Sequence, residues 1–397
     1  MVQADSLPDQ RGQSPLPPST SLLIIGGGIM GLWAALKAER LGIDTVLVDA
    51  GRLGSGASGG LLGALMPHMP DRWNDKKQFQ FDALLTLEDE IARLEAETGL
   101  SAGYRRCGRI IPLPKPHLRA IAERHSLEAA TNWDQQGQRF HWHVLNAPPV
   151  EQWVSASAGE AGFVHDTFAA KVSPRALVAA LVARLKAAQH VRLVEGCKVV
   201  SLDQQRVAHF SDGERLSFGH AIVSAGYSSF PLLTQAFGLS AEPALGQAVK
   251  GQAALLKARI DPAMPVVFLN GLYVVPHEDG TVAIGSTSED VFADPFGTDE
   301  KLDALLSAAR EIVPELSRAE VIECWAGLRP KAIGRDPMVG AHPERPEIVA
   351  LTGGFKVSFG LAHRLADAAL CAVQGKDMDV PSSFRTEAHL ALVHGNL

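Results

Sequence analysis

The sequence lacks any run of about 18 apolar residues, which is the length that a membrane-spanning helix requires. Its first twenty residues are polar and rich in proline, without the apolar core of a secretory signal peptide. Cysteine is scarce: the four cysteines form no CxxC pair, so neither a zinc ribbon nor a dithiol redox motif is indicated. We therefore expect a cytoplasmic protein with no disulfide scaffold and no resident metal, beginning with a disordered tail over residues 1–19.

An excess of positive charge is also lacking, because 37 Lys and Arg face 44 Asp and Glu. The formal net charge of −7 argues against a nucleic-acid partner, since phosphate binding relies on a basic face. A hydrophobic fraction of 46% and a charged fraction of 20% are ordinary for a globular protein. At about 150 residues per domain, 397 residues predict two or three units.

The N-terminal region has the pattern of a strand–helix–strand unit. Residues 21–28, SLLIIGGG, are typical of a buried strand that ends in a glycine turn. Residues 29–41 have a helical pattern, and Gly42 suits the position just after the helix. The apolar run DTVLVDA, residues 44–50, predicts a second strand. Such a βαβ unit is typical of a parallel sheet.

Three glycines in this unit fit the GxGxxG pattern of a dinucleotide site. Gly26 permits the tight turn, Gly28 lets the backbone approach a pyrophosphate, and Gly31 lets the helix pack on the strand. The positive N-terminus of the helix then faces the phosphates. Asp49 ends the next strand and can accept hydrogen bonds from ribose hydroxyls. The alternative is an ordinary glycine turn with a surface aspartate, which this context disfavours.

The remaining elements are predicted from periodicity and from turn residues. Residues 104–153 are mixed in pattern and allow no assignment. Helices are expected at 83–98, at 174–185 with Ser173 as N-cap, at 299–312 and at 358–371. Strands are expected at 190–194, 197–202, 220–224 and 347–351, with a strand-rich region over 247–286.

The glycine motif does not separate NAD from FAD, but the next segment helps. An NAD dehydrogenase usually continues with another helix–strand unit, whereas this chain enters the small-residue loop SGASGG, residues 55–60. From here the chain resembles the D-amino-acid oxidase family of flavoproteins, in its glycine oxidase and sarcosine oxidase branch. Segments that resemble family motifs follow in family order, over about 21–375. They are GASGGLLGALMPH (56–68), SPRALVAAL (173–181), CKV (197–199), IVSAGYSS (222–229), LYVVPHEDGTVAIGSTSE (272–289), AGLRPKAIGRDPMVG (326–340) and TGGFKVSFGLAH (352–363).

The resemblance implies an α/β fold with FAD as its cofactor. A discontinuous Rossmann-like FAD-binding domain would comprise residues 20–85, 155–232 and 326–385. An α+β substrate domain with an antiparallel sheet would be inserted into it as residues 86–154 and 233–325. Residues 386–397 are expected to be a C-terminal tail.

The motif and the resemblance together predict which residues form the cofactor site. Most are small residues that let a ligand approach the backbone. They are Gly26, Gly28, Ile29, Met30, Gly31, Asp49, Ala50, Arg52, Ala57, Ser58, Leu62, Gly63, Ala64, Leu65, Val199, Ser224, Ala225, Gly226, Arg329, Gly354, Phe355, Lys356, Val357, Ser358 and Gly360.

Four side chains are candidates for the substrate side of the site. Arg329 is expected to hold a substrate carboxylate, because guanidinium binds carboxylate bidentately; the alternative is a structural ion pair. Lys356 is a candidate second cation or a solvated lysine, and Tyr273 a hydroxyl donor or a sheet-packing residue. His68 is a further candidate, although a surface histidine fits its loop better.

Some features of the sequence depart from the family pattern or conflict. Gly354-Phe355-Lys356 stands where relatives often have His, an aromatic residue and Arg, and His277 where they often have Arg or Lys. These departures concern the substrate. Cys324 lies six residues before Pro330, the place of a flavin-linked cysteine in the sarcosine oxidase branch, yet the surrounding Gly-Leu-Arg-Pro is typical of the other branch. The alternation His141-Trp142-His143 is only weak evidence for metal ligands.

We therefore expect an FAD-dependent oxidoreductase that oxidises the C–N bond of a small amino acid or secondary amine by hydride transfer to flavin. Its other partner would be O2 or another electron acceptor, and a homo-oligomer is possible. One alternative is a dehydrogenase that passes electrons to a quinone or a protein. Another is a non-catalytic flavoprotein subunit of a complex. A tRNA-modifying relative is disfavoured by the acidic balance.

Overall fold

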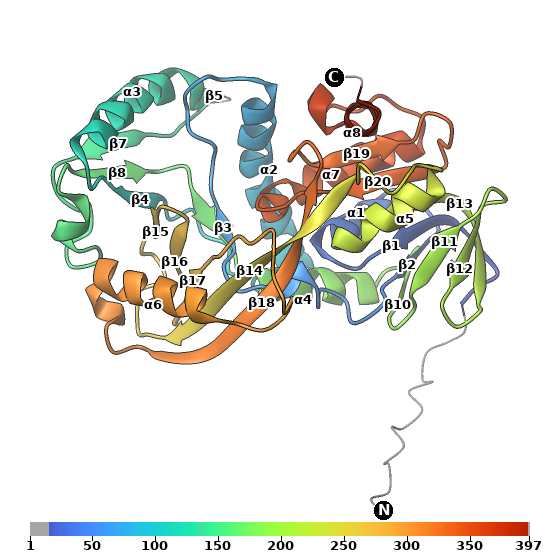
Figure 1. Cartoon of the computed structure of the whole chain (residues 1–397), viewed down its shortest axis with the longest axis horizontal. Coiled ribbons are helices and arrows are strands. Elements are labelled where there is room, and N and C mark those ends of the chain that lie inside the picture. The colour runs from blue at the N-terminus through green and yellow to red at the C-terminus, as the bar shows by residue number, and fades with distance from the viewer. Residues whose placement is uncertain (1–15, 136, 396–397) are drawn as a thin grey trace, which may run out of the picture.

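Two eight-stranded sheets, each in its own lobe, organise the chain (Figure 1). The computed structural model describes residues 16–135 and 137–395. Most of the predicted N-terminal tail, residues 1–15, lies outside the described residues. Ser19 already belongs to a strand, so the first sheet begins inside the predicted tail. In the part of the chain described here, no helix is long and apolar enough to cross a bilayer.

The first sheet is a largely parallel sheet in the order β10-β2-β1-β13-β12-β11, with β20 beside β13 and β19 beside β20. The five strands β10, β2, β1, β13 and β20 are parallel to their neighbours in this group. The eight strands are β1 (Ser19–Ile25), β2 (Thr45–Val48), β10 (Val191–Val194), β11 (Val199–Leu202), β12 (Val207–Phe210), β13 (Arg215–Val223), β19 (Met338–Ala341) and β20 (Ile348–Thr352).

Helices cover both faces of this sheet, which explains the continuous apolar runs in its strands. Leu22 and Ile24 of β1 pack on one face with the helices α1, α2, α4 and α7, and Leu23 and Ile25 on the other with α5 and α8. The helices are α1 (Ile29–Arg40), α2 (Asp75–Thr98), α4 (Pro174–Lys186), α5 (Ser229–Ala236), α7 (Ser358–Val373) and α8 (Thr386–Val393).

The second sheet has the order β18-β14-β17-β16-β15-β4-β8-β7, and only the β4–β15 pair is parallel. Helix α6 (Glu300–Ile312) covers one face, and α3 (Pro116–Asn132) lies beside β7. The strands are β4 (Arg109–Pro112), β7 (Trp142–Leu145), β8 (Phe163–Asp166), β14 (Gly246–Lys257), β15 (Val266–Leu269), β16 (Leu272–Pro276), β17 (Thr281–Gly285) and β18 (Glu320–Ala332). Two-stranded pairs join β3 (Ala64–Leu65) to β9 (Ala170–Lys171) and β5 (Asp134–Gln135) to β6 (Gln138–Arg139).

The predicted fold class is confirmed, including the discontinuity, because strands of the first sheet come from three separate stretches of sequence. Helices predicted at 29–41, 174–185, 299–312 and 358–371 are present with small shifts at their ends. Ser173 does occupy the N-cap position, but its side chain makes no capping hydrogen bond.

Four helices were mispredicted or missed, and one of them is α5, since no helix was predicted over Ser229–Ala236. Helix α2 begins at Asp75 instead of residue 83, since Asn74 caps it by accepting from the Lys77 amide. Helix α3 was not predicted because it buries only Ala122 and Ala129 and so has no apolar stripe. The C-terminal tail predicted from residue 386 is wrong over Thr386–Val393, which form α8.

Two predicted domain boundaries disagree with the strand pairing, because one separates β8 from its sheet and the other falls inside β18. Strand β8 lies within residues 155–232, which were assigned to the FAD-binding domain, yet it pairs with β4 and β7 of the second sheet. The boundary at 325/326 falls inside β18. We therefore propose that the first boundary lies beyond Asp166 and the second beyond Ala332.

Candidate active site

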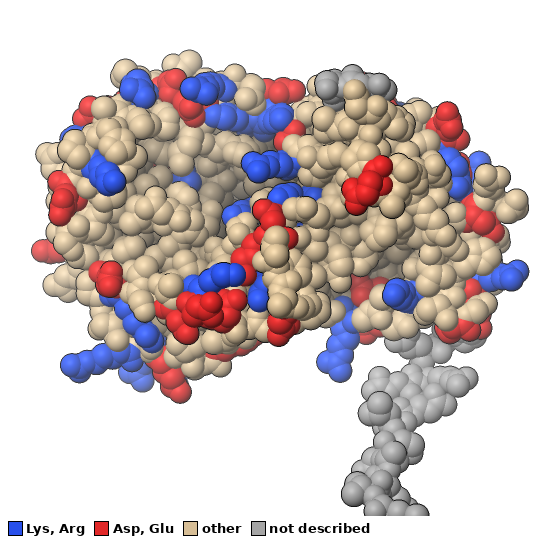
Figure 2. Space-filling view, viewed as in Figure 1, with Lys and Arg blue, Asp and Glu red and all other residues tan. Residues whose placement is uncertain are grey.

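One cavity of about 1050 Å³ lies between the two sheets. Its walls combine the first sheet's strand ends, the loop over residues 54–69, one face of the second sheet and residues 351–360. The face of the molecule drawn in Figure 2 is hollowed near its middle, and Lys and Arg side chains lie around the hollow.

The three motif glycines take different positions at one end of the cavity. Gly26 has φ +106°, and a Cβ there would lie 2.5 Å from the Ser224 carbonyl oxygen, so only glycine fits this turn. A Cβ at Gly31 would overlap the Gly26 carbonyl oxygen, which explains the close packing of α1 on β1. Gly28 lines the cavity, where the nearest atom to a Cβ is Ser58 Oγ at 3.2 Å. An occupant can therefore approach the backbone at Gly28.

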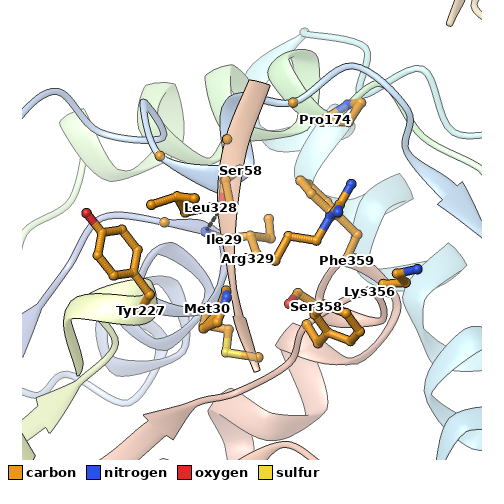
Figure 3. A pocket seen from close by; sticks show the side chains of 18 of the residues that line it. Ile29, Met30, Ser58, Pro174, Tyr227, Leu328, Arg329, Lys356, Ser358 and Phe359 are labelled. Carbon is orange, nitrogen blue, oxygen red and sulfur yellow. Dashed lines mark hydrogen bonds between the residues drawn. The ribbon is translucent and has the colours of Figure 1, made fainter. Parts of the chain in front are cut away.

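Hydrogen bonds fix the segments around these glycines. The Asp49 carboxylate accepts from the amides of Gly27 and Gly51, both at 2.7 Å. The Ile29 amide, first in α1, donates to Ser58 Oγ at 2.9 Å (Figure 3). Residues 57–59, which form a short 3₁₀ turn, are thereby tied to the N-terminus of α1. The N-terminus of α7 lines the same cavity, so two helix dipoles direct their positive ends into it.

One face of the second sheet lies against the cavity, as the residues opposed across its strands show. Directly opposed residues in neighbouring strands lie on the same face of a sheet. Across β18, β14, β17, β16 and β15, the opposed residues are Trp325, Ala253, Gly285, Tyr273 and Phe268. All of these except Gly285 line the cavity. The face that carries this row is thus the one opposite α6.

Arg329, on β18, extends its guanidinium into this space. Its Nη1 donates to the Thr287 carbonyl oxygen at 3.1 Å. None of the described carboxylates lies within ion-pair distance of Arg329. Burial lowers the pKa of Arg329 to about 10, so the side chain remains charged at neutral pH. Gly251, on the neighbouring strand, is diagonal to Arg329, and a Cβ there would overlap Nη1, Cζ and Nη2, so the absence of a side chain leaves space for the guanidinium.

Lys356 lies near Arg329 on the loop before α7. Figure 3 shows Arg329, Lys356 and Phe359 on one side of β18 and Tyr227 on the other. Burial and then the charge of Arg329 lower the pKa of Lys356. Its Nζ lies 5.4 Å from the centre of the Phe355 ring, a cation–π distance. Phe355 has φ +43°, and its amide donates to the Pro330 carbonyl oxygen at 3.1 Å, which ties this loop to β18.

Tyr273 and His68 complete the set of predicted catalytic side chains. Burial raises the pKa of Tyr273, although the charges of Arg109 and Arg329 act in the opposite direction. His68 is exposed and also lines the cavity, and its amide donates to Gln80 Oε1 at 2.6 Å. Desolvation by the surrounding atoms lowers the pKa of His68, although the residue as a whole is exposed. His68 is therefore at the surface, as its loop favoured, and also at the wall of the cavity.

All four predicted catalytic residues line the cavity, as do most of the predicted cofactor residues. Gly31, Arg52 and Gly354 do not line it. Arg109, Tyr227 and Trp325 line it and were not predicted. Trp325 lies four residues before Arg329 on the same strand, so the two side chains share a face and the position of Trp325 could have been predicted from this spacing. No local signal marks Arg109. The His141 and His143 rings stack with centroids 5.0 Å apart, and no group of three or more metal-ligating side chains occurs among the described residues.

Comparisons with known proteins agree with this architecture. A family model described as FAD dependent oxidoreductase matches residues 21–368. Glycine oxidase from Pseudomonas putida KT2440 is 29% identical over 342 residues, which cover 82% of this chain and 86% of that protein. The crystal structure of glycine oxidase from Geobacillus kaustophilus has a TM-score of 0.82 at 22% identity, covering 93% of this chain and 99% of that one. L-proline dehydrogenase from P. horikoshii has a TM-score of 0.79 at 16% identity, with coverages of 96% and 99%.

The cavity fits the cofactor that the family model specifies. Its volume suits a large, elongated ligand. Gly28 and Ser58 leave space at the α1 N-terminus, where a pyrophosphate would be held by backbone amides and the helix dipole. Asp49, which lines the cavity beside these glycines, would accept hydrogen bonds from ribose hydroxyls. The α7 N-terminus and Lys356 would supply positive charge for a flavin ring, whose reduced form is anionic.

Substitution of Gly28 by Val is expected to give colourless protein, because a branched side chain would fill the space at the α1 N-terminus. Absorbance near 450 nm after purification would measure bound FAD. Cooperative thermal unfolding of the variant would show that the fold is intact. Stoichiometric FAD in a folded Gly28→Val protein would contradict this placement of the dinucleotide.

FAD is expected to be released on acid precipitation. Cys324 pairs in register with Ala254, which packs beneath α6, and Cys324 does not line the cavity. Yellow colour should therefore appear in the supernatant of both the unchanged protein and Cys324→Ser. A yellow pellet that the Cys324→Ser substitution abolishes would instead establish a covalent bond to this cysteine.

Proposed function

Because this chain belongs to the D-amino-acid oxidase family of FAD-dependent oxidoreductases, we propose that its substrate is a small amino acid or a secondary amine that bears a carboxylate. The proposed reaction is oxidation of the C–N bond at the carbon next to the carboxylate. The glycine oxidases that resemble the chain over most of its length support this class of substrate.

The observation that carries the proposal is the unpaired guanidinium of Arg329 in the cavity. Arg329 and Lys356 supply positive charge at the substrate end, and the described residues that line the cavity include no glutamate. The one lining aspartate, Asp49, lies at the dinucleotide end. A substrate carboxylate would fill the guanidinium donors and neutralise a buried charge.

The reactive chemistry belongs to FAD, which accepts a hydride from the substrate carbon when it is bound. The protein's residues bind and orient the substrate. Arg329 would hold the carboxylate through two N–H donors, and Tyr273 would donate its hydroxyl to the same group. The raised pKa of Tyr273 keeps that hydroxyl protonated. Lys356 would balance negative charge at this end of the site.

The amine must reach the site without a proton on its nitrogen, since the lone pair has to support loss of hydride. No carboxylate is present at the substrate end among the described lining residues to hold an ammonium. The charges of Arg329 and Lys356 disfavour a protonated amine in the same cavity. His68, whose imidazole lines the cavity, is our candidate for accepting that proton.

Two alternatives differ in the fate of the electrons. A dehydrogenase that uses a quinone or a protein acceptor is favoured by the fold likeness to L-proline dehydrogenase. Hydrogen peroxide formed in air at the rate of substrate oxidation would distinguish an oxidase from it. A non-catalytic flavoprotein subunit is disfavoured by Arg329. Bound flavin that no amine or amino acid reduces would support that third function.

Replacing Arg329 by Leu is expected to weaken productive substrate binding by about 3 kcal/mol or more, roughly a hundredfold or greater loss in kcat/KM. Arg329→Lys should recover only part of this loss, because the planar fork is gone. The spectrum of bound FAD should stay unchanged in both variants. Substrate oxidation by Arg329→Leu at the original rate and KM would rule out this carboxylate anchor.

Gly251→Ala is expected to raise KM about tenfold, because the new Cβ displaces the Arg329 guanidinium. The matched control is the same substitution in the Arg329→Lys background, where it should cost little further, since the two changes act on one interaction. Steady-state kinetics of the four proteins would measure the coupling. Additive losses in the double variant would show that Gly251 does not act through Arg329.

A further inference from the structure

Arg109 is a second arginine at the wall of the cavity, and nothing in its local sequence singles it out. It begins β4, is 2% exposed and lines the same cavity as Arg329 and Tyr273. In the order of the second sheet, the strand of Tyr273 lies between the strands of Arg329 and Arg109. The two arginines therefore come from strands on either side of the strand of Tyr273.

One carboxylate faces Arg109 and forms an ion pair with it inside the protein. Asp166 is the register partner of Arg109, and Arg109 Nη2 lies 2.6 Å from Asp166 Oδ2. This contact is a buried ion pair, although its angles fall short of a hydrogen bond, and the enclosed Nε atom has no hydrogen-bond partner among the described residues. A guanidinium has five N–H donors, and buried donors without acceptors cost free energy.

The backbone fixes Asp166 independently of Arg109. Asp166 Oδ1 accepts from the amides of Phe168 at 2.7 Å and Ala169 at 3.1 Å. The surroundings are aromatic, and the Arg109 Cζ lies 5.7 Å from the centre of the Trp142 ring. In such surroundings a buried ion pair is not more stabilising than apolar side chains of similar volume. A buried ion pair is therefore only weak evidence that this arginine serves the stability of the fold alone.

Tyr273 provides an independent indication that both cations act on the same space. The charges of Arg109 and Arg329 each act to lower its pKa against the effect of burial. Both arginines also line the cavity that Tyr273 lines, so a ligand there is within reach of two cations. A ligand with a single carboxylate on Arg329 would leave the second cation without a ligand anion.

We propose that Arg109 binds a second anionic group of the substrate, so that the preferred substrates are amino acids, or N-substituted amino acids, with two carboxylates. This inference rests on the proposed function, in which Arg329 holds the carboxylate next to the oxidised carbon. Asp166 offsets part of the charge of Arg109 and holds the guanidinium at the wall. The second carboxylate would bind at the part of the guanidinium that lines the cavity.

The first test compares diacids with monoacids as ligands of the FAD-loaded enzyme. Acetate, propionate, butyrate and pentanoate are titrated beside malonate, succinate and glutarate, and the change in flavin absorbance gives each dissociation constant. We expect at least one diacid to bind ten times more tightly than the monoacid of equal carbon number. Flavin reduction without oxygen is then compared for glycine, alanine and sarcosine against aspartate, glutamate and iminodiacetate, with both enantiomers where they exist.

The second test removes the buried pair without leaving an unpaired charge. In Arg109→Met combined with Asp166→Leu, the preference for diacids should disappear, while monoacid binding should stay within about threefold. The control Arg105→Met removes a half-exposed arginine that is paired with Glu278, and it should retain the preference. Arg109→Lys keeps a charge and should retain part of it.

The outcomes separate this inference from the proposed function. Equal binding of diacids and monoacids by the unchanged enzyme would overturn the role of Arg109, whether or not the double variant folds. A preference that survives in the folded double variant would overturn it as well. If diacids bind preferentially through Arg109 but no amino acid reduces the flavin, the anion site stands and the proposed oxidation is wrong. If monocarboxylic amino acids reduce the flavin and a second carboxylate brings no gain, only this inference is wrong.

Discussion

The guanidinium of Arg329 lies inside the protein with a backbone carbonyl as its hydrogen-bond acceptor and, among the described residues, no carboxylate partner. Such a charge is costly to bury, and the surrounding structure accommodates it at several points. The guanidinium occupies the space that a side chain at position 251 would fill, and residue 251 is glycine. The carbonyl oxygen of Thr287 accepts a hydrogen bond from the guanidinium. The burial that lowers the pKa of Arg329 still leaves it charged at neutral pH. An anionic ligand is the natural complement of this arrangement.

The two sheets bring this cation to the dinucleotide site. In the first sheet, parallel strands end in glycine turns, where Gly26 and Gly28 allow close approach to the N-terminus of α1. In the second sheet, antiparallel pairing aligns one face along the cavity, from Trp325 to Phe268. Strand β18 carries Arg329 at the substrate end of the cavity. The same strand is joined to the loop before α7, because the Phe355 amide donates to the Pro330 carbonyl oxygen. The redox group and the carboxylate anchor therefore have a fixed relation.

The sequence predicted features whose signals are local and missed those that depend on contacts between distant segments. The glycine turn at Gly26 and the acid at Asp49 follow a fixed spacing, and motifs in family order led to Arg329. Arg109 was missed because its role depends on β4 lying beside β8 and beneath the cavity, which no short pattern encodes. Helix α3 was missed because a helix that buries almost nothing has no apolar period. The C-terminal segment was misread because its short helix is stabilised by tertiary packing, with Leu390 buried against the first sheet.

The central claim is that recognition of a carboxylate makes an amine a substrate. Its most direct test is anaerobic reduction of the bound flavin by pairs of amines that differ only in that group, such as glycine with methylamine and sarcosine with dimethylamine. Bleaching of the flavin at 450 nm by a small amino acid, with none by its decarboxylated counterpart at the same concentration, is the result that the arrangement around Arg329 predicts. Equal bleaching by the simple amines, or bleaching by them alone, would contradict it.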